Sequence, residues 1–434
     1  MAGGTFYIGD GTVLRDGSLL VEDGRITAVG PRSRVEIPAG VRTYEAQGGF
    51  VTPGIIDTHS HMGVYAQPNV AAHADGNELT DPTTPYVFSE HGFWPQDPAI
   101  QAAVVGGVTT AQILPGSGNV IGGRAVVLKL RPRREARAMR FPGAPMALKM
   151  ACGENPKRLY GAKGKQPASR MGNIFKLRQA FIRAREYRLR RAAEKQAYTE
   201  WKENYDRAQQ DPNAAHPGPE PDAKPRDLGL ETLAAVLDGT IKVHIHCYRA
   251  DEMLLMLALA DELGFEVGTF HHAVEAYKIA DVLAKRGVHA AVWADWWGFK
   301  LEAYDATEAN AAILSAAGAR PNIHSDSPIG GQRLNQEAAK ALFEGRRMGL
   351  DIDDGEAIQW ITLNPAMSLG IADQTGSLTE GKMADLVIWD RDPLSVYART
   401  THVFIDGALV FDRSAEPERW SDFLVGTAVE ETTP

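Results

Sequence analysis

The sequence has few cysteines, no long apolar run and no excess of positive charge. Its 434 residues include only Cys152 and Cys247, too few for a disulfide scaffold, so we expect two small buried thiols in a reducing compartment. No run of about eighteen or more apolar residues occurs, and the first thirty residues lack the basic and apolar regions of an export signal. The net charge of −9 argues against a general nucleic-acid binder. These absences predict a cytoplasmic protein with no nucleic-acid partner and no membrane partner.

The overall amino-acid composition is that of an ordinary folded protein. Hydrophobic residues make up 44% of the chain and charged residues 23%, which excludes a disordered or fibrous protein. The 43 glycines exceed the roughly 7% of an average chain and indicate many tight turns. A length of 434 residues accommodates an α/β barrel of about 250 residues or more together with a second domain.

The two ends of the chain share one sequence pattern, in which apolar and polar residues alternate between turns that contain glycine and aspartate. Residues 1–52 read this way, with Asp16-Gly17 and Asp23-Gly24 as turn dipeptides, and so do residues 381–392 and 402–413. Such segments are typical of antiparallel strands, and the termini of folded chains are often close in space. We therefore predict one small β-sandwich domain built from residues 1–52 and 370–434.

Residues 53–369 alternate short apolar runs with helical stretches. The expected strands are 54–57, 108–114, 144–150, 241–246, 267–271, 289–293 and 321–323, and helices are expected at 250–264, 275–287 and 306–319. Strands that alternate with helices of about ten to fifteen residues predict βαβ units and a parallel sheet. Residues 124–130 depart from this pattern, because they follow the second strand after too few residues for a full helix.

A charged insertion interrupts the alternation at about 165–226. From Arg170 to Arg207 the chain is mostly basic, with apolar residues at helical spacing, and a proline-rich stretch follows. We expect a long surface helix and an irregular linker, which form a lid or a contact in a homo-oligomer. A solvated or subunit-contacting helix is favoured over a membrane-surface or nucleic-acid element.

Histidines gather where the expected strands end. Seven of the 12 lie there, namely His59, His61, His244, His246, His271, His272 and His324. In a parallel barrel the carboxyl ends of the strands build the active site. His59 and His61 are two apart on one strand, so both imidazoles can face the barrel mouth and share a cation such as zinc, although two polar core histidines would give the same spacing.

The segment VTPGIIDTHSHMG resembles the first barrel strand of the amidohydrolase superfamily, and TLNPAMSLG with GSLTEGKMADLVIWD resembles that family's return from barrel to sandwich. The resemblance implies a (β/α)8 TIM barrel with a small β-sandwich, one or two divalent metals, and hydrolysis of amide, ester or related bonds. GENPKRLYG is similar to an imidazolonepropionase-like subgroup, and the HxY at Tyr248 is similar to peptidase-like members.

The resemblance also implies roles for individual residues. The implied metal ligands are His59, His61, Lys149, His246, His272 and Asp326. Lys149 would be carboxylated and bridge two cations, most simply zinc, because a carbamate presents one anionic oxygen to each. Glu154 is the competing candidate for the bridging ligand. The alternative without a metal is that Lys149 simply reaches solvent from the end of its strand. His271 competes with His272 as the sixth-strand ligand.

Three residues are candidates for contact with a small-molecule substrate. Tyr248 would face it, as in peptidase-like relatives. Arg249 would bind a carboxylate or pair with an acidic residue of the following helix. Trp297 belongs to a group with Trp293 and Trp296 that would form an aromatic wall or merely plug the rim.

The implied function is a hydrolase that cleaves an amide-type C–N bond in an N-acyl amino acid, a dipeptide or a cyclic amide. A metal-activated hydroxide would attack, with Asp326 as proton shuttle. One alternative is a mononuclear deaminase or cyclic amidine hydrolase of the same superfamily, in which a strand-five glutamate moves protons. A non-catalytic binding or scaffold protein on this fold is the alternative of another class.

Overall fold

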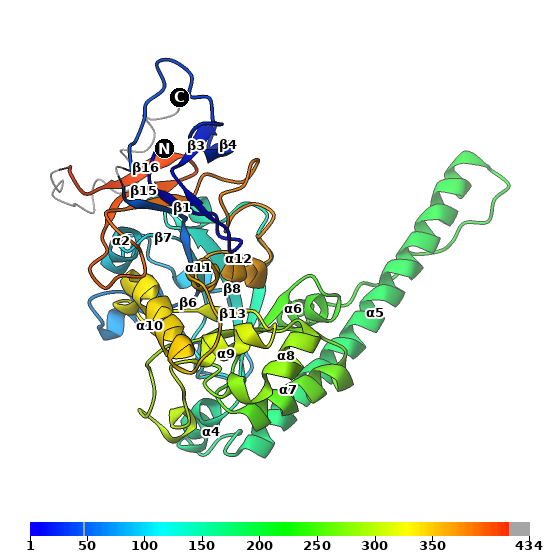
Figure 1. Cartoon of the computed structure of the whole chain (residues 1–434). Coiled ribbons are helices and arrows are strands. Elements are labelled where there is room, and N and C mark those ends of the chain that lie inside the picture. Colours follow the sequence, from blue (N-terminus) through cyan, green and yellow to red (C-terminus); the bar gives the residue numbers. More distant parts are fainter. Residues whose placement is uncertain (47, 416–434) are drawn as a thin grey trace.

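The computed structural model describes residues 1–46 and 48–415. A barrel occupies the centre, a second sheet built from both ends of the chain caps one end of it, and one long helix stands away from the body (Figure 1). Residues 416–434, the last part of the predicted sandwich range, lie outside the described residues.

Eight strands form the barrel sheet in the order in which they occur along the chain. They are β6 (Ile55–Ser60), β7 (Val108–Ile113), β8 (Ile121–Lys129), β9 (Ala147–Ala151), β10 (Lys242–His246), β11 (Val267–His271), β12 (His289–Val292) and β13 (Pro321–Ile323). Most of their residues are buried, as expected for strands covered on both faces. The barrel with a small sandwich, predicted from the sequence, is confirmed.

One barrel strand runs against the other seven. β8 pairs antiparallel with β7, Thr110 opposite Lys129, and antiparallel with β9, Gly123 opposite Lys149. The connection from β7 to β8 spans only 114–120, whereas a parallel crossover needs about a dozen residues or more. The third strand therefore departs from a regular (β/α)8 unit, and the shortness of this connection is the reason.

Helices follow most of the other strands. They are α2 (Pro98–Val105), α6 (Leu228–Leu237), α7 (Ala250–Leu263), α8 (Ala280–Arg286), α9 (Asn310–Ala316), α10 (Leu334–Arg347), α11 (Asp354–Gln359) and α12 (Leu363–Leu369). Gly264 ends α7 with φ 79° and Gly287 ends α8 with φ 65°, a left-handed backbone that glycine adopts without strain. The helix ends expected at these glycines are confirmed.

The terminal segments form a six-stranded sheet in the order β16 (Ala408–Asp412), β15 (Thr400–Ile405), β14 (Leu386–Trp389), β5 (Phe50–Pro53), β1 (Thr5–Tyr7) and β2 (Val13–Arg15). A separate hairpin, β3 (Gly17–Glu22) and β4 (Arg25–Pro31), turns at Asp23 and Gly24, both with positive φ. Phe6, Leu19 and Leu386 pack in the core shared by these elements. The division of the chain at residues 53 and 369 stays a prediction.

A buried ion cluster joins the barrel to the terminal sheet. Because β8 is reversed, its carboxyl end, Lys129, lies at the opposite end of the barrel from the strand-end histidines. Lys129 Nζ lies 3.0 Å from both carboxylate oxygens of Asp385 and also contacts Asp406. A buried cation with two anionic partners has its charge satisfied, which is the condition for burying it at all.

The insertion consists of one long helix, α5 (Arg170–Gln210), preceded by α4 (Glu154–Gly161) and followed by residues 211–227, which form neither helix nor strand, as expected for the linker. Its first half packs on the body through Leu177, Phe181 and Tyr187. Among the described residues of α5 beyond Tyr187 none is buried, and this part projects from the body (Figure 1). Within the described residues, no helix combines the length and apolar character needed to cross a membrane. The long insertion helix is confirmed, and a homo-oligomeric state stays a prediction.

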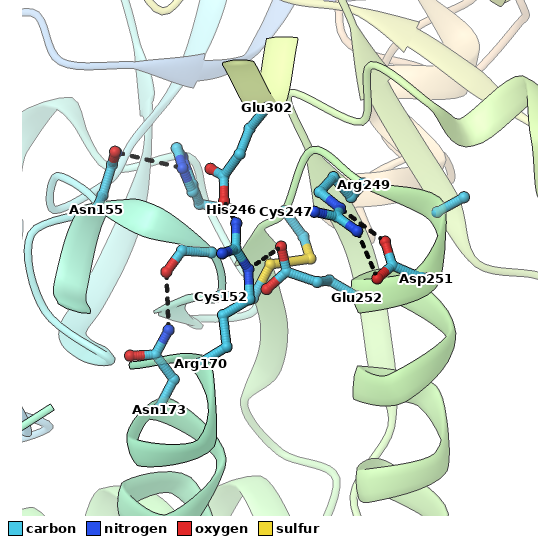
Figure 2. The surroundings of a disulfide bond; sticks show 12 residues. Cys152, Asn155, Arg170, Asn173, His246, Cys247, Arg249, Asp251, Glu252 and Glu302 are labelled. Carbon is cyan, nitrogen blue, oxygen red and sulfur yellow. Dashed lines mark hydrogen bonds and ion pairs between the residues drawn. A yellow bond between two sulfur atoms is a disulfide. The ribbon is translucent and has the colours of Figure 1, made fainter. Parts of the chain in front are cut away.

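Cys152 and Cys247 form a disulfide, so the expectation of two free thiols is wrong (Figure 2). The two cysteines directly follow β9 and β10, in which Ala151 lies opposite His246. Their Cα atoms are 5.3 Å apart, which is within the range for a disulfide. Strand register brings the pair together, and a count of cysteines carries no information about register.

Candidate metal centre

Three donor atoms converge where β6 ends and where the chain leaves β13. His59 Nε2 lies 3.3 Å from His61 Nε2, and Asp326 Oδ1 lies 3.3 Å and 3.1 Å from these two nitrogens. Ligands about 2.0–2.1 Å from a tetrahedral zinc ion are about 3.3–3.4 Å from one another. The three atoms therefore form a triangle of the size that one zinc ion requires.

The hydrogen-bond partners of the imidazoles fix which nitrogens are free to bind a metal. His61 Nδ1 lies 2.8 Å from the carbonyl oxygen of Leu114, which can only accept, so Nδ1 carries a proton and Nε2 is the nitrogen that faces Asp326. Nε2 is therefore the His61 atom that could bind a metal together with Asp326 Oδ1.

The backbone at the centre is unusual. Asp326 has φ 49° and His272 has φ 54°, a left-handed conformation that few residues other than glycine adopt and that often marks functional sites. The Asp326 N–H donates to His59 O at 2.9 Å, and Ser325 donates from both N and Oγ to the Asp57 carboxylate. Burial raises the pKa of Asp57 to about 6, against the effect of these hydrogen bonds. Asp57 thus ties the loop after β13 to β6 and holds Asp326 in place.

Lys149 points from β9 into this cluster. Its Nζ lies 3.4 Å from His59 Nε2 and donates to Pro115 O at 3.0 Å. Burial lowers the pKa of Lys149 to about 7, against the opposing effect of Asp326. Glu154 instead lies 3.8 Å from Lys300 Nζ. Among the described residues, the donors close enough to share one ion do not include Glu154. Of the two candidate bridges, Lys149 is the one that lies with the histidines.

The sixth-strand histidines take different partners. His272 Nδ1 lies 3.6 Å from Asp326 Oδ2 and 2.8 Å from His324 Nε2, and His324 Nδ1 lies 3.0 Å from Val292 O. Since that carbonyl only accepts, His324 holds its proton on Nδ1, His272 donates from Nδ1, and Nε2 of His272 keeps a lone pair. His324 is one of the seven histidines at expected strand ends, but no role was predicted for it; its position two residues before Asp326 in NIHSDSP is the signal that could have found it. His271 Nε2 is directed at His244 Nδ1, 2.8 Å away, rather than at Asp326.

His246 completes the group of proposed ligands at the end of β10. Its ring centroid lies 4.8 Å from that of His272, its Nε2 lies 3.3 Å from Asn155 Nδ2, and its buried Nδ1 has no hydrogen-bond partner among the described residues. Burial lowers the pKa of His59, His246 and His272 well below the usual value, so these imidazoles are neutral, as metal ligands must be.

Asp326 is the anion of the group. Burial acts to raise its pKa, but His272 and His61 outweigh this effect and hold the pKa well below the usual range. The donor set of neutral imidazole nitrogens, one carboxylate and a lysine of lowered pKa suits divalent zinc. The residues present therefore fit the metal that the sequence resemblance implies.

The candidate substrate residues differ in how close they lie to this centre. The Tyr248 ring is buried, 4.8 Å from the His246 ring and 5.6 Å from the His272 ring by centroid. The tryptophan that stacks on His272, at 4.6 Å, is Trp293, whereas Trp297 is 56% exposed. Arg249 pairs with Asp251 at 2.9 Å and 3.0 Å on the surface, the structural alternative expected for it.

The insertion helix begins at the rim of the centre. Arg170 pairs with Glu252 at 3.0 Å and contacts Glu302, next to the disulfide (Figure 2). Asn173 donates to Gly153 O at 2.8 Å. The sequence did not single out these contacts, because they join residues that are far apart along the chain.

The sequence profile described as the Amidohydrolase family matches residues 50–410. The chain belongs to the amidohydrolase family. It is 35% identical over 411 residues to "Amidohydrolase tasK" of Hapsidospora irregularis. The aligned region covers 91% of this chain but only 40% of that protein. The crystal structure of an amidohydrolase from Thermotoga maritima matches with a TM-score of 0.80 and 33% identity, over 95% of this chain and 99% of the other. An imidazolonepropionase of Ralstonia nicotianae is 42% identical over 52 residues, 11% of this chain and 12% of that protein. Family membership confirms the resemblance that the sequence motifs carry, and this chain spans less than half the length of the first of these relatives.

Proposed function

We propose that this protein is a metal-dependent hydrolase that cleaves an amide-type C–N bond in an N-acyl amino acid, a dipeptide or a cyclic amide. The observation that carries the proposal is the triangle of His59 Nε2, His61 Nε2 and Asp326 Oδ1, with edges of 3.1–3.3 Å. The centre would hold two zinc ions, with His59 and His61 as ligands of one, Asp326 beside them, and His246 and His272 as ligands of the other.

Lys149 would bridge the two ions as its carbamate. A lysine forms a carbamate with carbon dioxide only as the neutral amine. Burial lowers the pKa of Lys149 to about 7, so a large fraction of the amine is neutral near that pH. Its Nζ lies 3.4 Å from His59 Nε2, which places the group beside a proposed ligand of the first ion.

The bound ions would lower the pKa of water to about 7 and polarise the scissile carbonyl. Asp326, held as a carboxylate, accepts the proton that water loses and delivers it to the leaving nitrogen. Its two oxygens reach His61 on one side and His272 on the other, at 3.1 Å and 3.6 Å, so it lies at the middle of the centre. Tyr248 and Trp293 pack beside His272 and form an apolar wall near the reacting bond. Arg249 and Trp297 remain candidates for contact with the outer part of the substrate.

Two observations favour this reaction over the mononuclear deaminase or cyclic amidine hydrolase. The described strand β10 (Lys242–His246) contains no glutamate, the residue that would move protons in that alternative. Lys149 is also buried among the histidines, where a mononuclear site has no use for it.

Metal analysis tests the proposal. We expect two equivalents of zinc per chain, hydrolysis of amide substrates that stops with a chelator, and a lower melting temperature of the metal-free protein. A single equivalent, with an Lys149→Ala variant as active as the wild type, would contradict the binuclear centre. Identical melting with and without chelator would favour the binding or scaffold alternative.

A further inference from the structure

A row of apolar side chains runs along the side of α5 that faces away from the body. The side chains through which α5 packs on the body, among them Leu177 and Tyr187, lie on the other side of the helix. At 3.6 residues per turn, the four members of the row fall within about 40° around the helix. They are Met171, Phe175, Ile182 and Leu189, which are 82%, 51%, 43% and 64% exposed. A continuous exposed apolar row of this kind marks a contact surface.

The same side of α5 continues beyond the body. No described residue of α5 after Tyr187 is buried, and this part extends into open space (Figure 1). Trp201, on the opposite side, donates from Nε1 to Gly218 O at 3.0 Å, in the chain that returns after the helix. The side that continues the apolar row carries Glu200 and Glu203, both exposed. Because helices gain most of their stability from tertiary packing, a free side of this length indicates a partner.

The spacing of the row is symmetric about Ile182. Phe175 lies seven positions before it, and Leu189 lies seven positions after it. When two identical helices pair antiparallel about a two-fold axis at Ile182, positions equally far from Ile182 face each other. Phe175 of each copy then meets Leu189 of the other, and the two Ile182 side chains meet on the axis. Met171 meets Ala193, which is small enough to leave room for it.

The arginines beside the row do not oppose such a pairing. Arg178 pairs with Glu262 of its own chain at 2.7 Å and 2.8 Å. Arg185 donates to Leu263 O at 2.9 Å. Both guanidinium groups are therefore held at the end of α7, and the row is left without cations directed at a second copy.

Charges on the projecting part of α5 favour the antiparallel arrangement. Glu200 lies eighteen positions after Ile182. Lys163 and Lys165 lie nineteen and seventeen positions before it, exposed in the loop that leads into α5. The projecting part of each copy would pass the start of α5 in the other, with Glu200 and Glu203 beside these lysines. In a parallel pair, each Glu200 would face the other Glu200, and like charges would repel.

We propose that this side of α5 is the interface between two copies of the chain, which pair antiparallel about a two-fold axis at Ile182. A strip about 10 Å wide along the roughly 60 Å of α5 buries roughly 1,200 Å² over both copies, the lower end of the range for stable complexes. Glu200 and Glu203 would repel an anionic membrane or a nucleic acid. The pair of Lys202 with Asp206 lies on the other side of the helix and stays in solvent. The inference is independent of the proposed function, because none of these residues belongs to the candidate metal centre.

The oligomeric state gives the first test. Light scattering after size-exclusion chromatography should give twice the mass of one chain for the wild type. Ile182→Glu places two carboxylates against each other on the axis and should raise the dimer dissociation constant by about 30-fold or more. Its circular dichroism spectrum should match the wild type, because the side chain is exposed in the single chain. Phe343→Glu, at a 66% exposed position on α10, is the matched control and should stay dimeric. A monomeric wild type, or a dimeric Ile182→Glu, overturns the inference.

A charge exchange tests the contact of the projecting part. Glu200→Lys with Glu203→Lys should raise the dissociation constant by about threefold to tenfold, and so should Lys163→Glu with Lys165→Glu. A chain that carries all four changes should recover most of the loss, because each contact again joins opposite charges. If the four changes together weaken the dimer further, these groups do not face each other and the arrangement is wrong.

Cysteine cross-linking tests the register. Mild oxidation of an equal mixture of Phe175→Cys and Leu189→Cys chains should give a disulfide-linked dimer on a non-reducing gel. Phe175→Cys alone should give none, because its two copies would lie about 21 Å apart along the pair. Cys152 and Cys247 are already joined to each other and do not compete. A cross-link in Phe175→Cys alone, and none in the mixture, would show a parallel pair and overturn the inference.

Discussion

Two buried lysines lie on neighbouring strands of the barrel and reach opposite ends of it. Lys129 ends the reversed strand β8 and meets two carboxylates, with 3.0 Å to each oxygen of Asp385. Lys149, on β9, has no carboxylate in hydrogen-bond contact among the described residues and faces a carbonyl oxygen and an imidazole instead. The two lysine side chains are buried to a similar degree, but the groups that they contact differ. Lys129 is paired with carboxylates and joins two parts of the fold, whereas burial lowers the pKa of Lys149 and leaves it a nucleophilic amine.

The largest expected effect is on activity when the lysine of the metal centre is removed. If Lys149 bridges two ions as proposed, Lys149→Ala should lower kcat/KM by at least about 10³-fold, equivalent to about 4 kcal/mol, because that bridge would be lost. Short carboxylic acids in the assay should restore part of the activity by taking the place of the carbamate. Steady-state kinetics with and without acetate checks this, and full activity of Lys149→Ala without acid would contradict the role of the bridge.

The second-largest expected effect is on the stability of the fold, when Lys129 at the opposite end of the barrel is replaced. Lys129→Met leaves the buried Asp385 carboxylate without its cation and should lower the free energy of unfolding by about 3 kcal/mol or more. Its kcat/KM should stay at the wild-type value in protein that remains folded. Urea unfolding followed by circular dichroism measures the change. If Lys129→Met is as stable as the wild type, the ion cluster does not hold the two sheets together.

A smaller effect, on the pH dependence of the free energy of unfolding, distinguishes Lys149 from Lys129. The pKa of Lys149 is lowered to about 7 in the folded protein, below the value of about 10.4 in an unfolded chain, so between these values the unfolded state binds more protons. The metal-free protein should therefore gain stability as pH rises from about 7 to about 10, by at most about 1.4 kcal/mol per unit. Lys149→Met should lose this slope, and Lys129→Met should keep it. A slope that survives in Lys149→Met would show that another group causes it.

The smallest effect is expected at an exposed lysine on the projecting part of α5. Lys202 pairs with Asp206 in solvent, at 2.5 Å. Surface pairs of this kind contribute little, so Lys202→Ala should change the melting temperature by no more than about 1 °C and leave kcat/KM unaltered. A larger drop in melting temperature would indicate that this part of the helix has a partner in solution.

Much of the architecture could be predicted from the sequence because it depends on local patterns. The expected helix from Arg170 to Arg207 is α5 (Arg170–Gln210), and the apolar run 267–271 is β11 (Val267–His271). The convergence of His59, His61 and Asp326 followed from their places at strand ends. Their roles as ligands stay predictions.

What the sequence did not predict depends on contacts between distant segments. The disulfide of Cys152 with Cys247 arises from the register of β9 against β10, which no local pattern encodes. The contact of Asn155 with Lys300 likewise joins positions 145 residues apart. His324 acquires its partner only when β11 and β13 are brought to the same end of the barrel.

The disulfide also encloses the whole insertion in a covalent ring. Cys152 and Cys247 are 95 positions apart, and α4, α5, α6 and β10 all lie between them. A protease that cuts the projecting part of α5 therefore opens the ring without releasing a fragment. The nicked molecule would run as one species on a non-reducing gel and as two after reduction, with both new ends on the projecting part of α5, away from the candidate metal centre. The projecting part of α5 can in this way be cut, or replaced by a short linker, while the disulfide keeps the ends of the strands that carry Lys149 and His246 covalently joined.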